Sequence, residues 1–348
     1  MYPSQMNEDK AFDNLVPTTI SKPGTLWGTV WDYMAGDEIR EPASPPGPFA
    51  ADVRLAEPPA AEGLAVCWIG HSTVVIDIDG KRFLTDPIWS RRCSPFSLIG
   101  PRRFFDPPAP LNQVRYVDGV IISHDHYDHL DEATIRCLGQ RDVIFYVPRG
   151  VGKQLRDWGI SEKRIRERTW WEEIRIGLNH RLIATPARHF SGRGIFDRNR
   201  TLWVSWVIQG SRHRVFFGGD GGYFPGFDTI GRLYGPFDLT MLEIGAYHPN
   251  WGEIHLGPRN AVKAHRKLRG RVLLPIHWGT FKLALHAWNT PAEEVIEVAK
   301  KDGVQLLLPL PGKMIAPMGE TLISRWWEAE DDRQRIAAAD LDSLSYAD

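Results

Sequence analysis

Three imidazoles and two carboxylates are crowded into one six-residue stretch, residues 124–129, which reads His-Asp-His-Tyr-Asp-His. The apolar run that precedes it, residues 119–123, is typical of a buried strand. Residues 130–138 follow with helical spacing of their apolar side chains, and we expect Asp131 to cap this helix. Core packing does not explain so many ionisable groups on one turn, whereas zinc binds neutral imidazole nitrogen and carboxylate oxygen. The stretch therefore predicts a metal site.

The composition is that of a globular chain. Of its 348 residues 43% are hydrophobic and 24% charged, so it is long enough to bury a large core. A net charge of -1 provides no long-range field that would recruit nucleic acid or acidic lipid. The three cysteines suit neither a zinc knuckle nor a disulfide framework, which indicates a reducing compartment. With neither a signal peptide nor an apolar stretch of about 18 residues, a cytoplasmic protein is expected.

Three segments are expected along the chain. Residues 1–60 form an N-terminal extension, in which residues 26–34 have the pattern of a short amphipathic helix. The Pro- and Ala-rich residues 41–60 are typical of an extended linker or a surface strap. Residues 61–320 are expected to form one continuous domain, and residues 321–348 an acidic C-terminal tail, helical or frayed.

From residue 64 onward, short apolar runs alternate with turns and helical patterns. Asp79-Gly80 is a strong hairpin signal early in this region, and helical patterns at residues 257–268 and 291–301 separate later runs. Early hairpins followed by alternating strands and helices predict an α/β layered sandwich. The predicted strands are residues 64–69, 73–78, 81–85, 143–147, 182–185, 203–208, 214–217, 239–244, 271–276 and 305–308.

A metal site needs ligands from outside one turn. Open α/β sheets gather functional residues where strands end, and three further candidates come shortly after predicted strands: His189, Asp220 and His277. Glycines on both sides of Asp220 let the backbone approach closely without a Cβ clash. Because these positions and the six-residue stretch span residues 124–277, one continuous domain is favoured over two.

In this order, the residues resemble the metallo-β-lactamase superfamily of dinuclear metal hydrolases. Other segments between residues 64 and 312 are similar to its N-acyl-phosphatidylethanolamine-hydrolysing phospholipase D branch. These branch-specific segments are residues 70–73, 84–88, 94–95, 100–104, 170–173, 235–239, 244–247 and 277–281. The sequence departs from that branch after Asp220, where Gly-Gly-Tyr replaces Thr-Gly-Tyr, and after His255, where Leu-Gly-Pro replaces Val-Asp-Pro.

The resemblance implies an αββα sandwich, a single domain with an N-terminal extension, and two zinc ions at one edge, with manganese or iron as alternatives. Asp86 would accept the second N–H of a ligand histidine and so fix its tautomer. Seven residues would hold the metal: His124, His126 and His189 on one ion, Asp128, His129 and His277 on the other, and Asp220 between them.

Two metal ions about 3.5–4 Å apart can share a hydroxide at neutral pH. We therefore expect in-line attack on a phosphodiester, with catalytic roles for Asp128 and Asp220. His255 is a candidate donor to a phosphoryl oxygen, the alternative being a surface-loop histidine. Residues 89–105 interleave arginine with aromatic residues, which is typical either of a lid or lipid-facing rim or of a solvated loop with its aromatics in the core.

Other functions stay open at this point. A lactonase or other ester hydrolase could use the same two ions to polarise a carbonyl. The near-neutral charge argues against a nuclease, and the full set of seven ligands argues against a non-catalytic metal-binding module. The expected partners are a phospholipid or another small hydrolysable substrate and no nucleic acid. Peripheral contact with a membrane and, from the resemblance, a homodimer are also expected.

Overall fold

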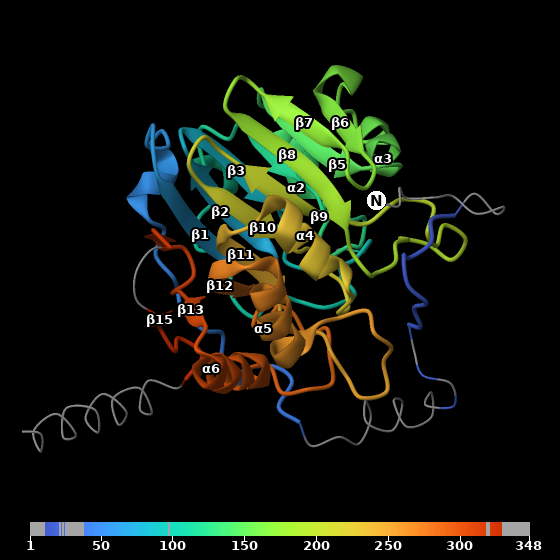
Figure 1. Cartoon of the computed structure of the whole chain (residues 1–348), viewed down its shortest axis with the longest axis vertical. Coiled ribbons are helices and arrows are strands. Elements are labelled where there is room, and N and C mark those ends of the chain that lie inside the picture. The colour runs from blue at the N-terminus through green and yellow to red at the C-terminus, as the bar shows by residue number, and fades with distance from the viewer. Residues whose placement is uncertain are drawn as a thin grey trace, which may run out of the picture.

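Two β-sheets form the centre of the protein (Figure 1). This computed structural model describes residues 11–20, 22, 24, 38–96, 98–317 and 321–328. The first sheet contains β1 (Leu64–Gly70), β2 (Thr73–Ile78), β3 (Lys81–Thr85), β4 (Gly119–Ile121), β5 (Ile144–Pro148), β6 (Ile165–Arg168) and β14 (Met314–Ile315). Its strand order is β14-β1-β2-β3-β4-β5-β6, and from β3 to β6 the neighbouring strands are parallel.

The second sheet lies against the first. It contains β7 (Glu173–Ile176), β8 (His180–Pro186), β9 (Val204–Gln209), β10 (Arg214–Phe217), β11 (Phe237–Glu243), β12 (Gly270–Ile276), β13 (Gln305–Leu308) and β15 (Leu322–Ile323). Its order is β15-β13-β12-β11-β10-β9-β8-β7, and the strands from β10 to β15 run parallel.

Helices cover the outer faces of both sheets. They are α2 (Glu132–Leu138), α3 (Val151–Asp157), α4 (Gly226–Tyr234), α5 (Gly257–Leu268) and α6 (Thr290–Asp302). Three short 3-10 turns lie in the connections between elements or before β1: η1 (Val53–Ala56), η2 (Leu111–Gln113) and η3 (Glu162–Arg164). α3 packs on β5 and β6, whereas α5 and α6 pack on β11, β12 and β13 (Figure 1). Within the described residues, no helix is long and apolar enough to cross a bilayer.

Alternation along the strands explains the layers. Successive side chains of a strand point to opposite faces of the sheet. Val66 and Trp68 of β1 therefore belong to the apolar core shared with the second sheet. Cys67 and Ile69, one residue further on, belong to a separate core under α2 and α3. Because both faces of the first sheet are buried, most side chains of its central strands are apolar, with the paired Asp77 and Arg82 as exceptions. The predicted αββα sandwich is confirmed.

The strongest sequence patterns are found as elements with slightly different ends. The predicted helix at residues 257–268 is α5, and residues 291–301 lie within α6. β6, β7, β14, β15, α3 and α4 were not predicted. β7 exposes Glu173 and Arg175, so charged residues alternate with its apolar ones and the continuous apolar run is missing. Edge strands of this kind carry a weak hydrophobic signal.

One prediction about α2 is wrong. Asp131 stands at the N-cap position, but its side chain makes no hydrogen bond to the helix backbone. The carboxylate accepts instead from the backbone N–H groups of Trp89 and Ser90 and from the Ser90 hydroxyl. Tertiary partners thus compete successfully with the local cap, and Asp131 ties α2 to the loop after β3.

The predicted helix at residues 26–34 and residues 329–348 of the predicted tail lie outside the described residues. Residues 41–60 have little regular structure beyond η1, and Leu55 of that turn is buried. Residues 321–328 contribute the edge strand β15 and two buried tryptophans. The division of the chain into three segments stays a prediction.

A fully buried arginine, Arg82 of β3, joins the extension to the first sheet. Its Nε and Nη2 donate to the two carboxylate oxygens of Asp77, each at 2.6 Å. The same guanidinium donates to the carbonyl oxygens of Arg54, Leu55 and Arg115 at 2.9–3.0 Å. One side chain therefore satisfies a carboxylate and three carbonyls that burial has largely removed from water.

We expect Arg82→Met to lower the free energy of unfolding by about 3 kcal/mol, because it leaves a mostly buried carboxylate and three carbonyls without a donor. Urea unfolding measures the change. Lys153→Met removes a cation from an exposed i,i+4 pair with Asp157 and is the matched control, for which little change is expected. Equal stability of both variants would contradict this role of Arg82.

Candidate metal centre

The carboxyl ends of several strands meet at one edge of the sandwich. β1 and β3 are both antiparallel to β2 and so run in one direction, and in the second sheet β8 runs with β10 and β12. The loops that leave these ends carry ionisable residues, and the sequence predicted all of them except His71 as residues of the site. They are His71 after β1, Asp86 after β3, His124 after β4, His189 after β8, Asp220 after β10 and His277 after β12.

Three predicted ligands form a first group. The Nε2 of His124 lies 2.9 Å from the Nδ1 of His126, and the Nε2 of His189 lies 3.4 Å from the same Nδ1. His124 and His189 are buried, although 65 residues separate them in the chain. Three ring nitrogens therefore converge on one point.

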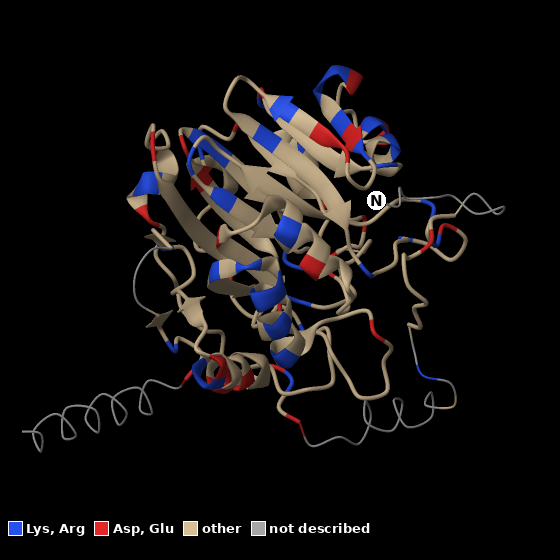
Figure 2. Cartoon of the chain, in the orientation of Figure 1, with Lys and Arg blue, Asp and Glu red and all other residues tan. Residues whose placement is uncertain are grey.

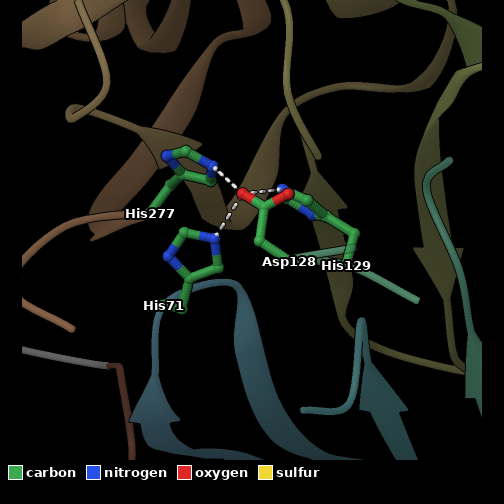
Figure 3. Close-up of side chains that lie close together, drawn as sticks. All are labelled: His71, Asp128, His129 and His277. Atoms are coloured by element: carbon green, nitrogen blue, oxygen red, sulfur yellow. Dashed lines mark hydrogen bonds and ion pairs between the residues drawn. The ribbon is translucent and has the colours of Figure 1, made fainter. Parts of the chain in front are cut away.

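A second group surrounds the carboxylate of Asp128 (Figure 3). Its Oδ2 lies 3.3 Å from the Nε2 of His277 and 3.5 Å from the Nε2 of His129. The Nε2 of His71 lies 3.0 Å from the same oxygen. The structure thus brings together the three predicted residues of this group and adds a histidine to them.

Asp220 lies between the two groups. Its Oδ2 is 3.2 Å from the Nε2 of His129, 3.1 Å from the Nε2 of His277 and 3.9 Å from the Nε2 of His189. Its other oxygen, Oδ1, is buried and has no hydrogen-bond partner among the described residues. A carboxylate in this position can contact a metal ion held by either group.

These residues fit divalent metal ions. In each group the ligand atoms lie within 4.8 Å of one another, and the donor set of imidazole nitrogens and carboxylate oxygens suits zinc, manganese or iron. The partnerless Oδ1 of Asp220 provides a further acceptor that burial would otherwise leave unsatisfied. The assignment of the individual ligands stays a prediction.

The electrostatics of the pocket favour the binding of metal ions. Burial holds the pKa of His124 and of His189 well below the ordinary value, which keeps both rings in the neutral form that binds metal. Burial also lowers the pKa of His277, but Asp220 and Asp128 outweigh it and raise this pKa to about 10. The carboxylates therefore make the pocket attract positive charge.

Asp86 positions two of the histidines. The Nδ1 of His129 lies 2.7 Å from Asp86 Oδ2, which leaves its Nε2 facing Asp220. The hydroxyl of Ser123 donates to the same oxygen at 2.6 Å and lies 2.9 Å from the Nδ1 of His124. Carboxylates that hold the second nitrogen of a ligand histidine set its tautomer and ring orientation, as predicted for Asp86.

Glycines around Asp220 are required by close approach. A Cβ on Gly219 would lie 2.5 Å from the Cβ of Ser123, and one on Gly222 would lie 1.7 Å from the carbonyl oxygen of Glu253. Gly219 also has a φ of +59°, a left-handed conformation that favours glycine. Both contacts hold the Asp220 loop against neighbouring loops of the site.

The metal-binding groups form the floor of a pocket of about 330 Å³. Large apolar side chains make up much of its wall. They are Ile20, Phe190, Trp251, Ile254 and Leu283. The pocket therefore combines an ionic floor with an apolar wall.

Comparison with known proteins agrees with this geometry. The model of the Beta-lactamase superfamily domain matches residues 81–278, more than half of the chain. The chain belongs to the beta-lactamase superfamily. The matched region includes all seven predicted metal ligands. The relatives of the chain include an N-acyl-phosphatidylethanolamine-hydrolyzing phospholipase D, from the branch that the sequence resembles.

The relatives of this chain include both an uncharacterized protein and a named phospholipase D. An uncharacterized protein of Mycobacterium tuberculosis is 44% identical over 329 residues, which are 92% of this chain and 86% of the relative. An N-acyl-phosphatidylethanolamine-hydrolyzing phospholipase D of Caenorhabditis elegans is 37% identical over 232 residues, 64% of this chain and 65% of the relative.

Solved structures share the superfamily fold. Igni18, a metallo hydrolase from Ignicoccus hospitalis, has a TM-score of 0.56 at 21% identity and covers 72% of this chain and 97% of its own. An isothiocyanate hydrolase from Delia radicum gut bacteria has a TM-score of 0.58 at 20% identity and covers 74% of this chain and all of its own. At these identities the likeness supports the metallo-β-lactamase fold alone.

His255 lies in the pocket and has a buried partner that the sequence analysis missed. Its Nδ1 lies 2.5 Å from Oε2 of Glu243, which is itself fully buried at the end of β11. Glu243 Oε1 also accepts from the backbone N–H groups of Gly221 and Leu256. Burial lowers the pKa of His255, but Glu243 outweighs it and raises this pKa above the ordinary value.

His71 was also missed as a site residue. It follows β1 in a turn with a φ of +54°, and two other residues of the site, Asp86 and His277, have φ values of +33° and +62°. Left-handed backbone at residues other than glycine costs about 1–3 kcal/mol and gathers at functional sites. The position of His71 directly after a predicted strand is the signal that could have identified it.

The N-terminal residues support the site from outside the family match. The side-chain amide of Asn14 donates to the carbonyl oxygen of His189 at 2.7 Å, and its Oδ1 accepts from the backbone N–H of His189 at 3.0 Å. Ile20 lines the pocket, and its carbonyl oxygen accepts from the N–H of Gly252. The residues from Asn14 to Ile20 thus connect the His189 loop to the loop that carries His255.

We expect Asp86→Asn to weaken metal binding about 10- to 100-fold, because an amide nitrogen cannot accept the N–H of His129 or the hydroxyl of Ser123. Competition with a chelator, followed by elemental analysis, measures the affinity. Asp106→Asn changes an exposed aspartate that also precedes a proline and is the matched control. Unchanged affinity in Asp86→Asn would exclude a positioning role.

Proposed function

We propose that this metal-dependent hydrolase uses two zinc ions to cleave a phosphodiester bond in phospholipids like N-acyl-phosphatidylethanolamine. The observation that carries the proposal is the pair of ligand groups joined by Asp220 on the floor of a pocket with an apolar wall. The name of the Caenorhabditis elegans relative supports the substrate class.

His124, His126 and His189 would hold one ion, Asp128, His129 and His277 the other, with Asp220 shared. Bound there, the two ions would supply a water-derived nucleophile at neutral pH and neutralise negative charge on the phosphoryl oxygens. The protein's part is to keep the ligands oriented. Asp86, Ser123 and the carbonyl of Ile254 hold the second nitrogens of three ligand rings.

Phospholipid substrates need both halves of the pocket. A phosphodiester bears a negative charge that suits the cation-attracting floor, whereas acyl chains gain free energy when they leave water, about 25 cal/mol per Å² of apolar surface. Ile20, Phe190 and Trp251 lie on the wall where such a chain could pack. A small hydrophilic diester would use only the floor.

His255 is positioned to donate a proton to the leaving group. Because Glu243 holds its Nδ1, the Nε2 is the nitrogen left for the pocket. Phospholipase D chemistry breaks the bond between phosphorus and the ethanolamine oxygen, and that oxygen leaves as an alkoxide unless a proton reaches it. We assign this proton to His255, with Glu243 as the residue that positions the ring.

A nuclease is less well supported. The sequence of α5 contains four Lys or Arg residues and no acidic residue, and its basic segments are blue in Figure 2. Three of these cations face acidic residues of neighbouring helices: Arg259 pairs with Glu294, Arg266 with Asp302 and Lys267 with Asp228. A basic face that is neutralised within the protein offers little attraction to a nucleic-acid backbone.

We expect the purified protein to contain about two metal ions per chain and to cleave N-acyl-phosphatidylethanolamine and bis-p-nitrophenyl phosphate. Asp220→Ala should lose both metal and at least about 10³-fold of the turnover, because the two groups lose their shared carboxylate. Asp142→Ala, an exposed aspartate before β5, should keep full activity.

The same assay includes an acyl-lactone. Turnover of the lactone alone, with two metal ions bound, would contradict the phosphodiester proposal and favour an ester hydrolase with the same metal centre. Full metal content without turnover of any of the three compounds would favour a non-catalytic module. The expected homodimer and cytoplasmic location stay predictions.

We expect His255→Ala to reduce turnover according to the leaving group. The loss should be about 10²-fold or more for an alkyl diester such as the ethanolamine lipid, and less than about tenfold for a p-nitrophenyl diester, whose leaving group needs no proton. His180→Ala at the distant end of β8 is the control. Equal losses on both substrates, with full metal content, would remove His255 from proton transfer.

A further inference from the structure

Two loops beside the metal centre present large apolar side chains to solvent. In residues 91–102 they are Phe96, Leu98 and Ile99, and in residues 190–200 they are Ile195 and Phe196; their exposed fractions lie between 63% and 90%. Single exposed apolar residues are common on protein surfaces. Five within two loops of one region are not, and such groups mark interaction sites.

The loop of residues 190–200 is anchored to the metal-binding turn. The Nη1 of Arg193 donates to the carbonyl oxygens of Asp125 and Leu130, each at 2.8 Å, and its guanidinium lies 3.8 Å from the centre of the Tyr127 ring. Phe190, at the start of the loop, lines the pocket over the metal centre. The exposed tip therefore stands beside the pocket.

The loop of residues 91–102 borders the same region. Cys93 packs in a small apolar cluster with Phe281 and Leu283, and Leu283 lines the metal pocket. On its other side, residues of this loop and Arg193 line a groove of about 640 Å³. The two loops therefore flank a common groove next to the pocket.

Both loops are rich in arginine. Residues 91–102 contain three arginines and no acidic residue, and residues 190–200 contain three arginines and one aspartate. That aspartate, Asp197, accepts backbone N–H groups of its own loop. Arg91, Arg102 and Arg198 are exposed. In a chain whose net charge is -1, this is a local excess of positive charge beside exposed apolar residues.

We propose that residues 91–102 and 190–200 form a docking surface for an anionic lipid bilayer. Aromatic and aliphatic side chains at the loop tips enter the interface, and the arginines bind lipid phosphates. Docking in this way directs the pocket of the metal centre toward the membrane. This docking surface rests on the function proposed above, because a lipid substrate would reach the pocket from the docked face.

The test uses the full-length protein and sedimentation with phosphatidylcholine vesicles, with and without phosphatidylglycerol. We expect binding to the anionic vesicles that weakens as sodium chloride is raised, because salt screens the arginines. The double variant Leu98→Ser/Phe196→Ser should bind at least about tenfold more weakly. Leu178→Ser is the matched control, since this fully exposed leucine precedes the seven-residue strand β8, roughly 20 Å from the site.

Hydrolysis separates docking from catalysis. The double variant should cleave soluble bis-p-nitrophenyl phosphate like the wild type but lose turnover of lipid in vesicles. Absence of vesicle binding by the wild type, or equal losses in the double variant and in Leu178→Ser, would overturn the docking surface. Vesicle binding without any phosphodiester cleavage would support docking and refute the proposed function.

A second copy of the chain, instead of a lipid bilayer, is the alternative occupant of the docking surface. Analytical ultracentrifugation of the same proteins measures the oligomeric state without lipid. A dimer that dissociates in Leu98→Ser/Phe196→Ser but not in Leu178→Ser would assign the loops to a protein interface and overturn the lipid proposal. An oligomeric state that is the same in all three proteins supports it.

Discussion

Burial of imidazoles and carboxylates in one pocket is the constraint on which the rest of the structure depends. Removing a charged group from water costs several kcal/mol unless partners replace the lost hydration. The protein provides these partners for one atom of each group: Asp86 for His129, the Ile254 carbonyl for His189 and Glu243 for His255. Oδ2 of Asp220 lies close to the Nε2 atoms of His129 and His277, and its Oδ1 is buried without a hydrogen-bond partner among the described residues. Cations would supply the partners that these atoms lack, and this is why so polar a centre suits metal chemistry.

The two sheets make this concentration of charge possible because their apolar faces carry the stability. Strands whose side chains alternate between two cores hold their ends in fixed positions, and the candidate ligands lie on the loops beyond those ends. His71, Asp86 and His277 adopt left-handed backbone conformations there, and each of them directly follows a strand that fixes where its loop begins. The surrounding loops are less constrained, so they can carry the apolar wall, the N-terminal support around Asn14 and the arginine-rich surface without disturbing the metal centre.

Much of the site could be predicted because its residues follow strands. Residues 124–129 were identified from their density of ligands, and His189, Asp220 and His277 from their positions after apolar runs. Glu243 escaped notice because it was taken as part of a predicted strand, residues 239–244, and an acidic residue inside a strand looks unremarkable until its burial is known. Asn14 could not be predicted, since its contact with His189 joins residues 175 positions apart. Asp131 was misassigned because a tertiary partner, the loop at Trp89, competes with the local helix cap.

The sequence by itself determined the fold class, the seven candidate ligands and the superfamily resemblance, because periodicity and ligand spacing are local properties of the chain. Only the tertiary structure decided which oxygen of Asp220 stays without a partner, that His71 joins the Asp128 group, and that Glu243 holds His255. It also decided that residues 91–102 and 190–200 flank one groove. The physical reason is the same in each case: these relations depend on distances between segments that folding brings together, and chain order does not contain those distances.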